Sequence, residues 1–189
     1  MIIREKYLSK IRPFYDQDLI KVIMGVRRCG KSVILLQIID ELKEKGIPDS
    51  QIIYINFEYE DYAFIKNDMD LHNYIKEKII NENKYYLFFD EIQRYKEIVT
   101  KIKFLVEDQR YRYILSASLL GVEIVNLKSA PVGYLKTLQM YPLDFEEFLQ
   151  LFQISDAVFE ALRGAYQNET PVDPIIHKKM LHIAHSNRE

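Results

Sequence analysis

One stretch near the N-terminus restricts the possible folds more than any other part of the chain. Residues 21–32 read Lys-Val-Ile-Met-Gly-Val-Arg-Arg-Cys-Gly-Lys-Ser, an apolar strand followed by a loop bounded by Gly25 and Gly30. A helix is predicted to begin at Lys31. The spacing from Gly25 to Ser32 fits the pattern G-x-x-x-x-G-K-[ST], which is typical of loops that bind phosphate groups. An ordinary glycine-rich turn is the alternative.

The residue types in this loop suit an anion. Glycine adopts backbone angles that other residues avoid, and it leaves no side chain between loop and ligand. The N–H groups at a helix N-terminus favour negative charge. We expect Lys31 to reach the β- and γ-phosphates and Ser32 to offer its hydroxyl to Mg²⁺. The residues predicted to bind the nucleotide are Gly25, Val26, Arg27, Arg28, Cys29, Gly30, Lys31, Ser32 and Val33.

Two alternatives stay open inside the loop. Arg27 and Arg28 are either phosphate or partner contacts or a solvated pair. Cys29 either makes nucleotide binding sensitive to oxidation or is a small residue that the loop tolerates.

Two acidic residues complete the predicted site. A buried strand, Tyr85–Phe89, runs directly into Asp90 and Glu91. Neighbouring carboxylates at a strand end point in different directions. Asp90 can therefore hold Mg²⁺ together with Ser32, while Glu91 orients or deprotonates the attacking water. An acidic surface turn is the alternative.

Further polar residues follow the predicted strands. Ser116 and Ser118 lie where the strand at 111–115 ends, and Ser116 is predicted to contact the γ-phosphate or the water in a catalytic role with Lys31 and Glu91. An exposed turn is the competing explanation. Gln93 could polarise water or simply begin a helix. Three histidines near the C-terminus, His177, His182 and His185, do not have the spacing of a known metal site.

Strands and helices alternate along the chain, which predicts an α/β fold with a parallel sheet and helices on both faces. Strands are expected at 19–24, 51–58, 85–89, 111–115 and 135–140, and helices at 4–15, 31–45, 70–82 and 97–109, after Asp144, and from Pro174. Asp144 and Glu147 have capping-box spacing. Gly164 is expected to interrupt the helical pattern. In the first helix, Arg4 is expected to lie outside the apolar face.

Composition excludes several classes of protein. The 189 residues are 48% apolar and 29% charged, with a net charge of −2, which argues against a dominant basic face. One cysteine rules out an internal disulfide and suits a reducing compartment, so a cytoplasmic location is expected. With no apolar run of 18 residues, no membrane span is expected.

Several segments in order resemble one family. They are Gly-Val-Arg-Arg-Cys-Gly-Lys-Ser, Tyr-Ile-Asn-Phe-Glu (54–58), Phe-Phe-Asp-Glu-Ile-Gln (88–93), Ser-Leu-Leu-Gly-Val (118–122), Pro-Val-Gly (131–133) and Tyr-Pro-Leu-Asp-Phe-Glu-Glu-Phe-Leu (141–149). Together they resemble prokaryotic AAA-type ATP-binding proteins that carry a C-terminal domain of unknown function. The resemblance implies an AAA/RecA-like P-loop NTPase core, binding of ATP with Mg²⁺, ATP hydrolysis, and Gly25–Ser32, Asp90 and Glu91 as working residues. The preference for adenine comes from the resemblance alone.

The sequence also departs from that family. Tyr134 stands where a basic residue is usual, leaving Lys136 or Arg112 as weak substitutes, and Ala117 replaces a usual glycine. Relatives continue into a second domain, so the expected organisation is an N-terminal helix (1–18), an ATPase domain (19–155) and a helical extension (156–189). A nucleotide-gated binding module with little turnover, acting on a protein or DNA partner, is the alternative function. The oligomeric state stays open, a homo-oligomer included.

Overall fold

The computed structural model describes residues 2–94, 110–118, 135–150 and 154–186, and the chain divides into two units. The core unit comprises Ile3–Pro142. The second unit comprises Leu143–Glu189 together with Met1–Ile2. Within the described ranges, no helix has both the length and the apolar character needed to cross a membrane.

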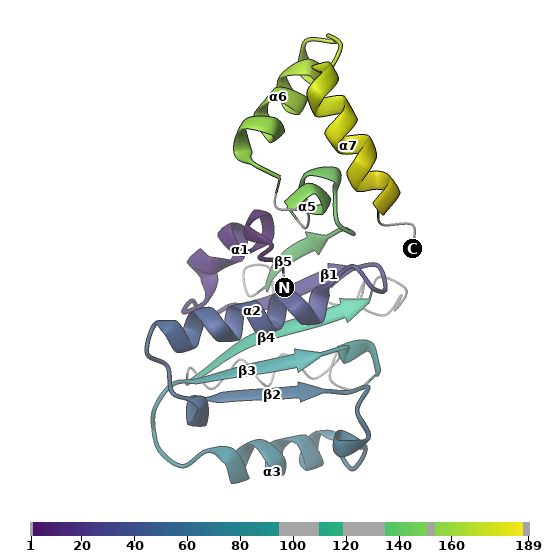
Figure 1. Ribbon diagram of the computed structural model, residues 1–189. Coiled ribbons are helices and arrows are strands. Elements are labelled where there is room, and N and C mark those ends of the chain that lie inside the picture. Colours follow the sequence, from purple (N-terminus) through teal and green to yellow (C-terminus); the bar gives the residue numbers. More distant parts are fainter. Residues whose placement is uncertain (1, 95–109, 119–134, 151–153, 187–189) are drawn as a thin grey trace. The chain divides into compact units, whose positions relative to one another are not determined.

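A five-stranded parallel sheet forms the centre of the core unit (Figure 1). Its strands are β1 (Ile20–Gly25), β2 (Ile52–Asn56), β3 (Tyr85–Asp90), β4 (Tyr111–Ser118) and β5 (Leu135–Met140), in the spatial order β2-β3-β4-β1-β5. Every residue of β3 is buried, because successive side chains enter the apolar layers on opposite faces. The predicted parallel α/β fold is confirmed.

Helices cover both faces of this sheet. On one face, α1 (Glu5–Ile11) and α2 (Lys31–Glu44) pack against a cluster that includes Phe88 and Ile114. On the other face, α3 (Asp68–Lys78) packs against a cluster that includes Leu87 and Leu115. Short 3₁₀ turns lie at Arg12–Phe14, Asp49–Gln51, Glu60–Tyr62 and Ile92–Arg94, the last of which is η4.

The second unit is helical. It contains α5 (Phe145–Gln150), α6 (Asp156–Gln167) and α7 (Pro174–Ser186). The predicted capping box before α5 is confirmed, since Asp144 Oδ1 accepts from the N–H of Glu147 (2.9 Å) and Glu147 Oε2 accepts from the N–H of Asp144 (3.1 Å). The prediction that Gly164 interrupts a helix is wrong, because α6 runs through it.

Other boundaries also differ from prediction. α3 begins two residues early, because Asn67 and Asp70 form a capping box. β4 continues three residues past its predicted end, through Ser118. The helix predicted at 97–109 lies outside the described residues.

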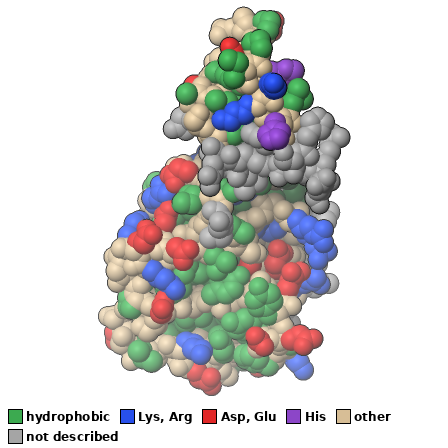
Figure 2. Space-filling view, in the orientation of Figure 1, with side chains coloured by type: hydrophobic (Ala, Val, Ile, Leu, Met, Phe, Trp, Pro, Cys, Tyr) green, Lys and Arg blue, Asp and Glu red, His purple; other side chains and the backbone are tan. Residues whose placement is uncertain are grey.

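Strand order determines where functional groups gather. In a parallel sheet all carboxyl ends lie at one edge, where ligands of open α/β sheets bind. β4 separates β1, which leads into the glycine loop, from β3, which ends in Asp90. On the face shown in Figure 2, acidic and basic side chains are interspersed over the core unit.

Candidate functional site

Two glycines give the loop between β1 and α2 its shape. A Cβ at Gly25 would lie 2.5 Å from the carbonyl oxygen of Met140 and 2.6 Å from Cys29 Sγ, so only glycine fits at this position. Gly30 has φ +93° and is the N-cap of α2, and Arg28 has φ +64°. The loop therefore reaches the N-terminus of α2 through left-handed backbone, which favours glycine.

The remaining loop side chains divide between solvent and core. Val26, Arg27 and Arg28 are exposed. Cys29 is buried and belongs to the apolar cluster beneath α2. Its side chain packs into the core, as expected for a small residue that the loop tolerates. Ser32 and Val33 lie partly exposed in the first turn of α2.

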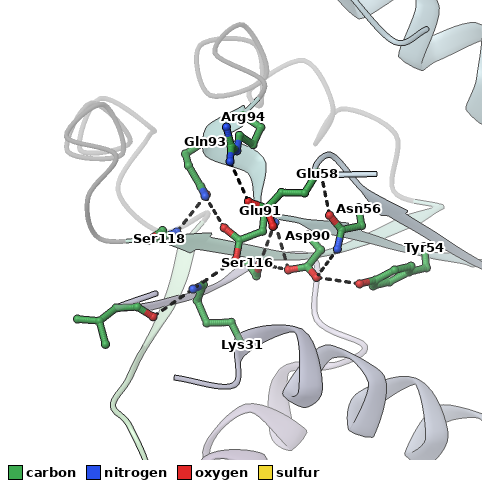
Figure 3. Close-up of polar contacts among 11 residues, drawn as sticks. Lys31, Tyr54, Asn56, Glu58, Asp90, Glu91, Gln93, Arg94, Ser116 and Ser118 are labelled. Carbon is green, nitrogen blue, oxygen red and sulfur yellow. Dashed lines mark hydrogen bonds and ion pairs between the residues drawn. The ribbon is translucent and has the colours of Figure 1, made fainter. Parts of the chain in front are cut away.

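Lys31 brings the loop and the acidic pair together. Its side chain is buried at the start of α2. Nζ donates a hydrogen bond to the carbonyl oxygen of Val26 (3.3 Å) and lies 3.5 Å from Glu91 Oε1 (Figure 3). The predicted lysine and the predicted catalytic acid are therefore direct neighbours.

Asp90 is fully buried and accepts hydrogen bonds from two neighbouring strands and from its own turn (Figure 3). Oδ2 accepts from Tyr54 Oη (2.8 Å) and Asn56 Nδ2 (3.2 Å), both on β2. Oδ1 accepts from Ser116 Oγ on β4 and from the N–H of Glu91 (3.1 Å). Burial, and then the charge of Asp90, raise the pKa of Tyr54, so this phenol stays a proton donor at neutral pH.

Glu91 occupies an uncommon backbone conformation. Its φ of +54° is in the left-handed region, which non-glycine residues seldom adopt. Its N–H also donates to Ser116 Oγ (3.0 Å), and its carbonyl oxygen accepts from the N–H of Arg94 (3.0 Å). Strained residues of this kind persist where surrounding contacts hold them and are common at functional sites.

A glutamine continues the network beyond Glu91. Gln93 Nε2 donates to Glu91 Oε2, and Gln93 Oε1 accepts from the N–H of Ser118 (3.0 Å) (Figure 3). Nearby, the exposed side chain of Arg94 forms an ion pair with Glu58 (3.0 Å).

The structure thus gathers Lys31, Asp90, Glu91 and Ser116 at the carboxyl edge of the sheet. The Ser116 hydroxyl donates to the Asp90 carboxylate and accepts from the main-chain N–H of Glu91, and its contact with phosphate or water stays a prediction. Tyr134 lies outside the described residues. The two suggested substitutes face elsewhere in the chain, because Arg112 donates to the carbonyl oxygen of Asp16 (2.7 Å) and Lys136 Nζ lies 4.2 Å from the centre of the Phe14 ring.

Sequence reasoning missed three residues. Tyr54 and Asn56 hold Asp90, and the signal available was a polar residue ending an apolar strand. The expectation that Arg4 lies outside is wrong. Arg4 is the N-cap residue before α1 rather than part of its outer face, and it is buried. Its Nη1 donates to the carbonyl oxygens of Cys29 (2.7 Å) and Tyr141 (3.1 Å), so it connects the loop to the end of β5.

These features define a class. A parallel sheet with an additional strand between the loop strand and the acid strand, together with a glycine loop, lysine and acidic pair, is a P-loop NTPase fold of the AAA/RecA-like type. A family model described as "AAA domain" matches residues 17–149. The chain belongs to this AAA domain family.

Relatives and solved structures were also found. An uncharacterized protein of Haemophilus influenzae is 39% identical over 153 residues, which are 79% of this chain and 38% of that protein. Uncharacterized protein MJ1544 of Methanocaldococcus jannaschii is 39% identical over 136 residues, 69% of this chain and 28% of that protein. The chain therefore spans well under half the length of these relatives.

Two solved structures show weaker likeness. The Aeropyrum pernix ORC2 protein in ADPNP–ADP complexes has 13% identity and a TM-score of 0.48, over 79% of this chain and 48% of that one. A chain of Drosophila ORC bound to GC-rich DNA and Cdc6 has 9% identity and a TM-score of 0.49, over 95% and 75%. The strand order and the family match define the fold, and these two similarities add nothing to it.

Proposed function

We propose that this chain binds ATP with Mg²⁺ at the loop Gly25–Ser32 and hydrolyses it. One observation carries the proposal: Lys31 Nζ, at the helix end of the loop, lies 3.5 Å from the carboxylate of Glu91. Residues that are far apart in the chain thus meet where a terminal phosphate and its attacking water would both be within reach. Membership of the AAA domain family supports the same reading.

The loop and Lys31 supply the phosphate contacts. The first N–H groups of α2 have no partners within the helix, and together with the lysine they offer positive charge to an anion. Arriving phosphate oxygens would replace Glu91 as the partner of Lys31. Binding would therefore free the Glu91 carboxylate at the moment when a water must be oriented.

The donor set also fits a magnesium ion. The Ser32 hydroxyl and the buried Asp90 carboxylate, which four hydrogen bonds hold in place, would hold the ion. When bound, the ion supplies positive charge to the β- and γ-phosphate oxygens.

The chemical step then falls to Glu91. Its carboxylate accepts a proton from the attacking water as the new bond to the γ-phosphorus forms and the bond to the β-phosphate oxygen breaks. The proton passes on to the released phosphate, and ADP leaves. Lys31 stabilises the charge that develops on the transferred group.

Two variants test these roles. Lys31→Ala should abolish binding of a fluorescent ATP analogue. Glu91→Gln should keep that binding while phosphate release falls by about 10²- to 10⁴-fold, the usual contribution of a general base. Arg94→Ala, which removes an exposed ion pair with Glu58, is the matched control. Equal phosphate release from wild type and Glu91→Gln would remove Glu91 from its role.

A nucleotide-gated binding module is the second candidate. The observation that favours it is that Tyr134 stands where a basic residue is usual, while Arg112 and Lys136 contact Asp16 and Phe14 instead. In that case ATP would bind tightly with negligible turnover, and a protein or DNA partner would be the functional output. Steady-state turnover measured beside ATP affinity, with and without added DNA, separates the two candidates. Thermal melts with Mg²⁺ and ATP, ADP or GTP identify the preferred base.

A further inference from the structure

We propose that Gln93 is a positioning residue that orients the Glu91 carboxylate for ATP hydrolysis. The inference rests on the proposed function and adds a residue to it. It is drawn from the contacts of the Gln93 side chain, which lies between the catalytic acid and the strand beside the glycine loop (Figure 3).

A local turn places Gln93 over Glu91. After the left-handed Glu91, the chain enters η4 (Ile92–Arg94), in which the N–H of Arg94 donates to the carbonyl oxygen of Glu91. Ile92 is fully buried in the apolar cluster on the α3 face and fixes this turn to the core. The side chain two residues after Glu91 is thereby brought back to the Glu91 carboxylate.

The two contacts require a primary amide. Gln93 Nε2 donates to Glu91 Oε2, while Oε1 accepts from the N–H of Ser118 at 3.0 Å. A carboxylate only accepts hydrogen bonds, and a backbone N–H only donates. Glutamine can satisfy both groups because its amide carries a donor and an acceptor on one rigid plane.

Ser118 relates this amide to the glycine loop. It is the last residue of β4 and lies in register with Gly25, the last residue of β1 and the first of the loop motif. Gln93 therefore fixes the Glu91 carboxylate relative to the strand from which the loop emerges. The opposite carboxylate oxygen of Glu91 faces Lys31. Without the amide, the contact with Lys31 would set the position of the acid, and that contact competes with phosphate.

This arrangement predicts a specific kinetic change. Gln93→Met keeps the length of the side chain and loses both hydrogen bonds. Gln93→Glu keeps an acceptor for Ser118 but places a second carboxylate beside Glu91. Both variants should lower kcat about 10- to 100-fold, the range known for removing partners that orient metal-binding residues. The dissociation constant for ATP should change less than about twofold, because neither variant alters the glycine loop.

A double-variant comparison excludes a merely structural role. If Gln93 acts through Glu91, then adding Gln93→Met to Glu91→Gln should lower the single-turnover rate no further. A structural role would reduce the rate by the same factor in both backgrounds. Gln17→Met is the matched control, since Gln17 is exposed and precedes β1 at the opposite edge of the sheet.

The outcomes separate this inference from the function on which it rests. Wild-type turnover together with unchanged kcat in Gln93→Met and Gln93→Glu overturns the role of Gln93 alone. Additive losses in the double variant overturn it as well. Wild-type turnover no higher than that of Lys31→Ala overturns the proposed hydrolysis and, with it, this inference. The melting temperature of each variant shows whether the variant is folded. If Gln93→Met does not fold, Gln93→Glu provides the test.

Discussion

The buried residue Lys21 allows a quantitative prediction of how the stability of the core depends on pH. This lysine lies inside β1 and is fully buried, with Nζ donating to the carbonyl oxygen of Gln17 at 2.6 Å. Burial, and then the charge of Arg112, lower the pKa of Lys21 to about 7. Asp18 and Asp16 act in the opposite direction, and Lys84 adds to the lowering. Replacing Lys21 with methionine keeps most of the buried volume and removes the titrating group.

The sign and size of the effect follow from proton linkage. The unfolded chain holds the proton up to about pH 10.5, whereas the folded chain releases it above about pH 7. Between these values the unfolded state binds more protons, so stability rises with pH. One pH unit within this window is worth up to about 1.4 kcal/mol. From pH 7 to pH 9, Lys21 should add about 2 kcal/mol to the free energy of unfolding.

The assay is urea unfolding at pH 7, 8 and 9, for wild type, Lys21→Met and Lys76→Met. Lys76 is exposed on α3 and serves as the matched control. In wild type and Lys76→Met, the free energy of unfolding should rise with pH by the same amount. In Lys21→Met, the rise from pH 7 to pH 9 should be smaller by about 2 kcal/mol. The slope is the test, because Lys21→Met also loses the bond to Gln17. The same slope in wild type and Lys21→Met would refute the reasoning.

Three further predictions concern the loop and the helices. Gly25→Ala should lower the free energy of unfolding by about 2 kcal/mol or more, because the new Cβ would lie 2.5 Å from the backbone carbonyl oxygen of Met140. The same variant should lose binding of a fluorescent ATP analogue, and unchanged binding would contradict the prediction. Arg4→Met leaves the carbonyl oxygens of Cys29 and Tyr141 without this donor. This substitution should lower the free energy of unfolding in urea by about 3 kcal/mol. A loss below about 0.5 kcal/mol would show that the contacts of Arg4 with these two carbonyl groups contribute little to stability. Gly164→Ala should stabilise α6 by about 0.5–1 kcal/mol in a thermal melt, because no atom of the described residues outside the local helix backbone lies within 4 Å of the added methyl group. A lower melting temperature would contradict this prediction.

The sequence alone predicted the parts of the fold that depend on local patterns. The apolar run Tyr85–Phe89 identified β3 because both faces of the sheet are covered, which leaves no polar alternation. The glycine spacing identified the loop, and the position of Asp90 and Glu91 at a strand end placed them at its mouth. Each of these signals is contained in a few consecutive residues.

Long-range contacts could not be read from the sequence in the same way. That Tyr54 and Asn56 bind Asp90 depends on β2 lying beside β3, which the chain order does not state. The burial of Arg4 depends on carbonyl groups more than a hundred residues away, at Tyr141. The left-handed backbone of Glu91 follows from the hydrogen bonds around it, since glutamate has no local preference for that conformation.

The four hydrogen bonds on Asp90 have an evolutionary consequence. Tyr54, Asn56 and Ser116 each direct a polar group to the buried Asp90 carboxylate, so a change at any single position leaves that carboxylate without one of its donors. Substitutions at these positions are therefore expected to occur together rather than one at a time. Across the relatives of this chain, residues on three adjacent strands should covary as one unit, although they are widely separated in the gene.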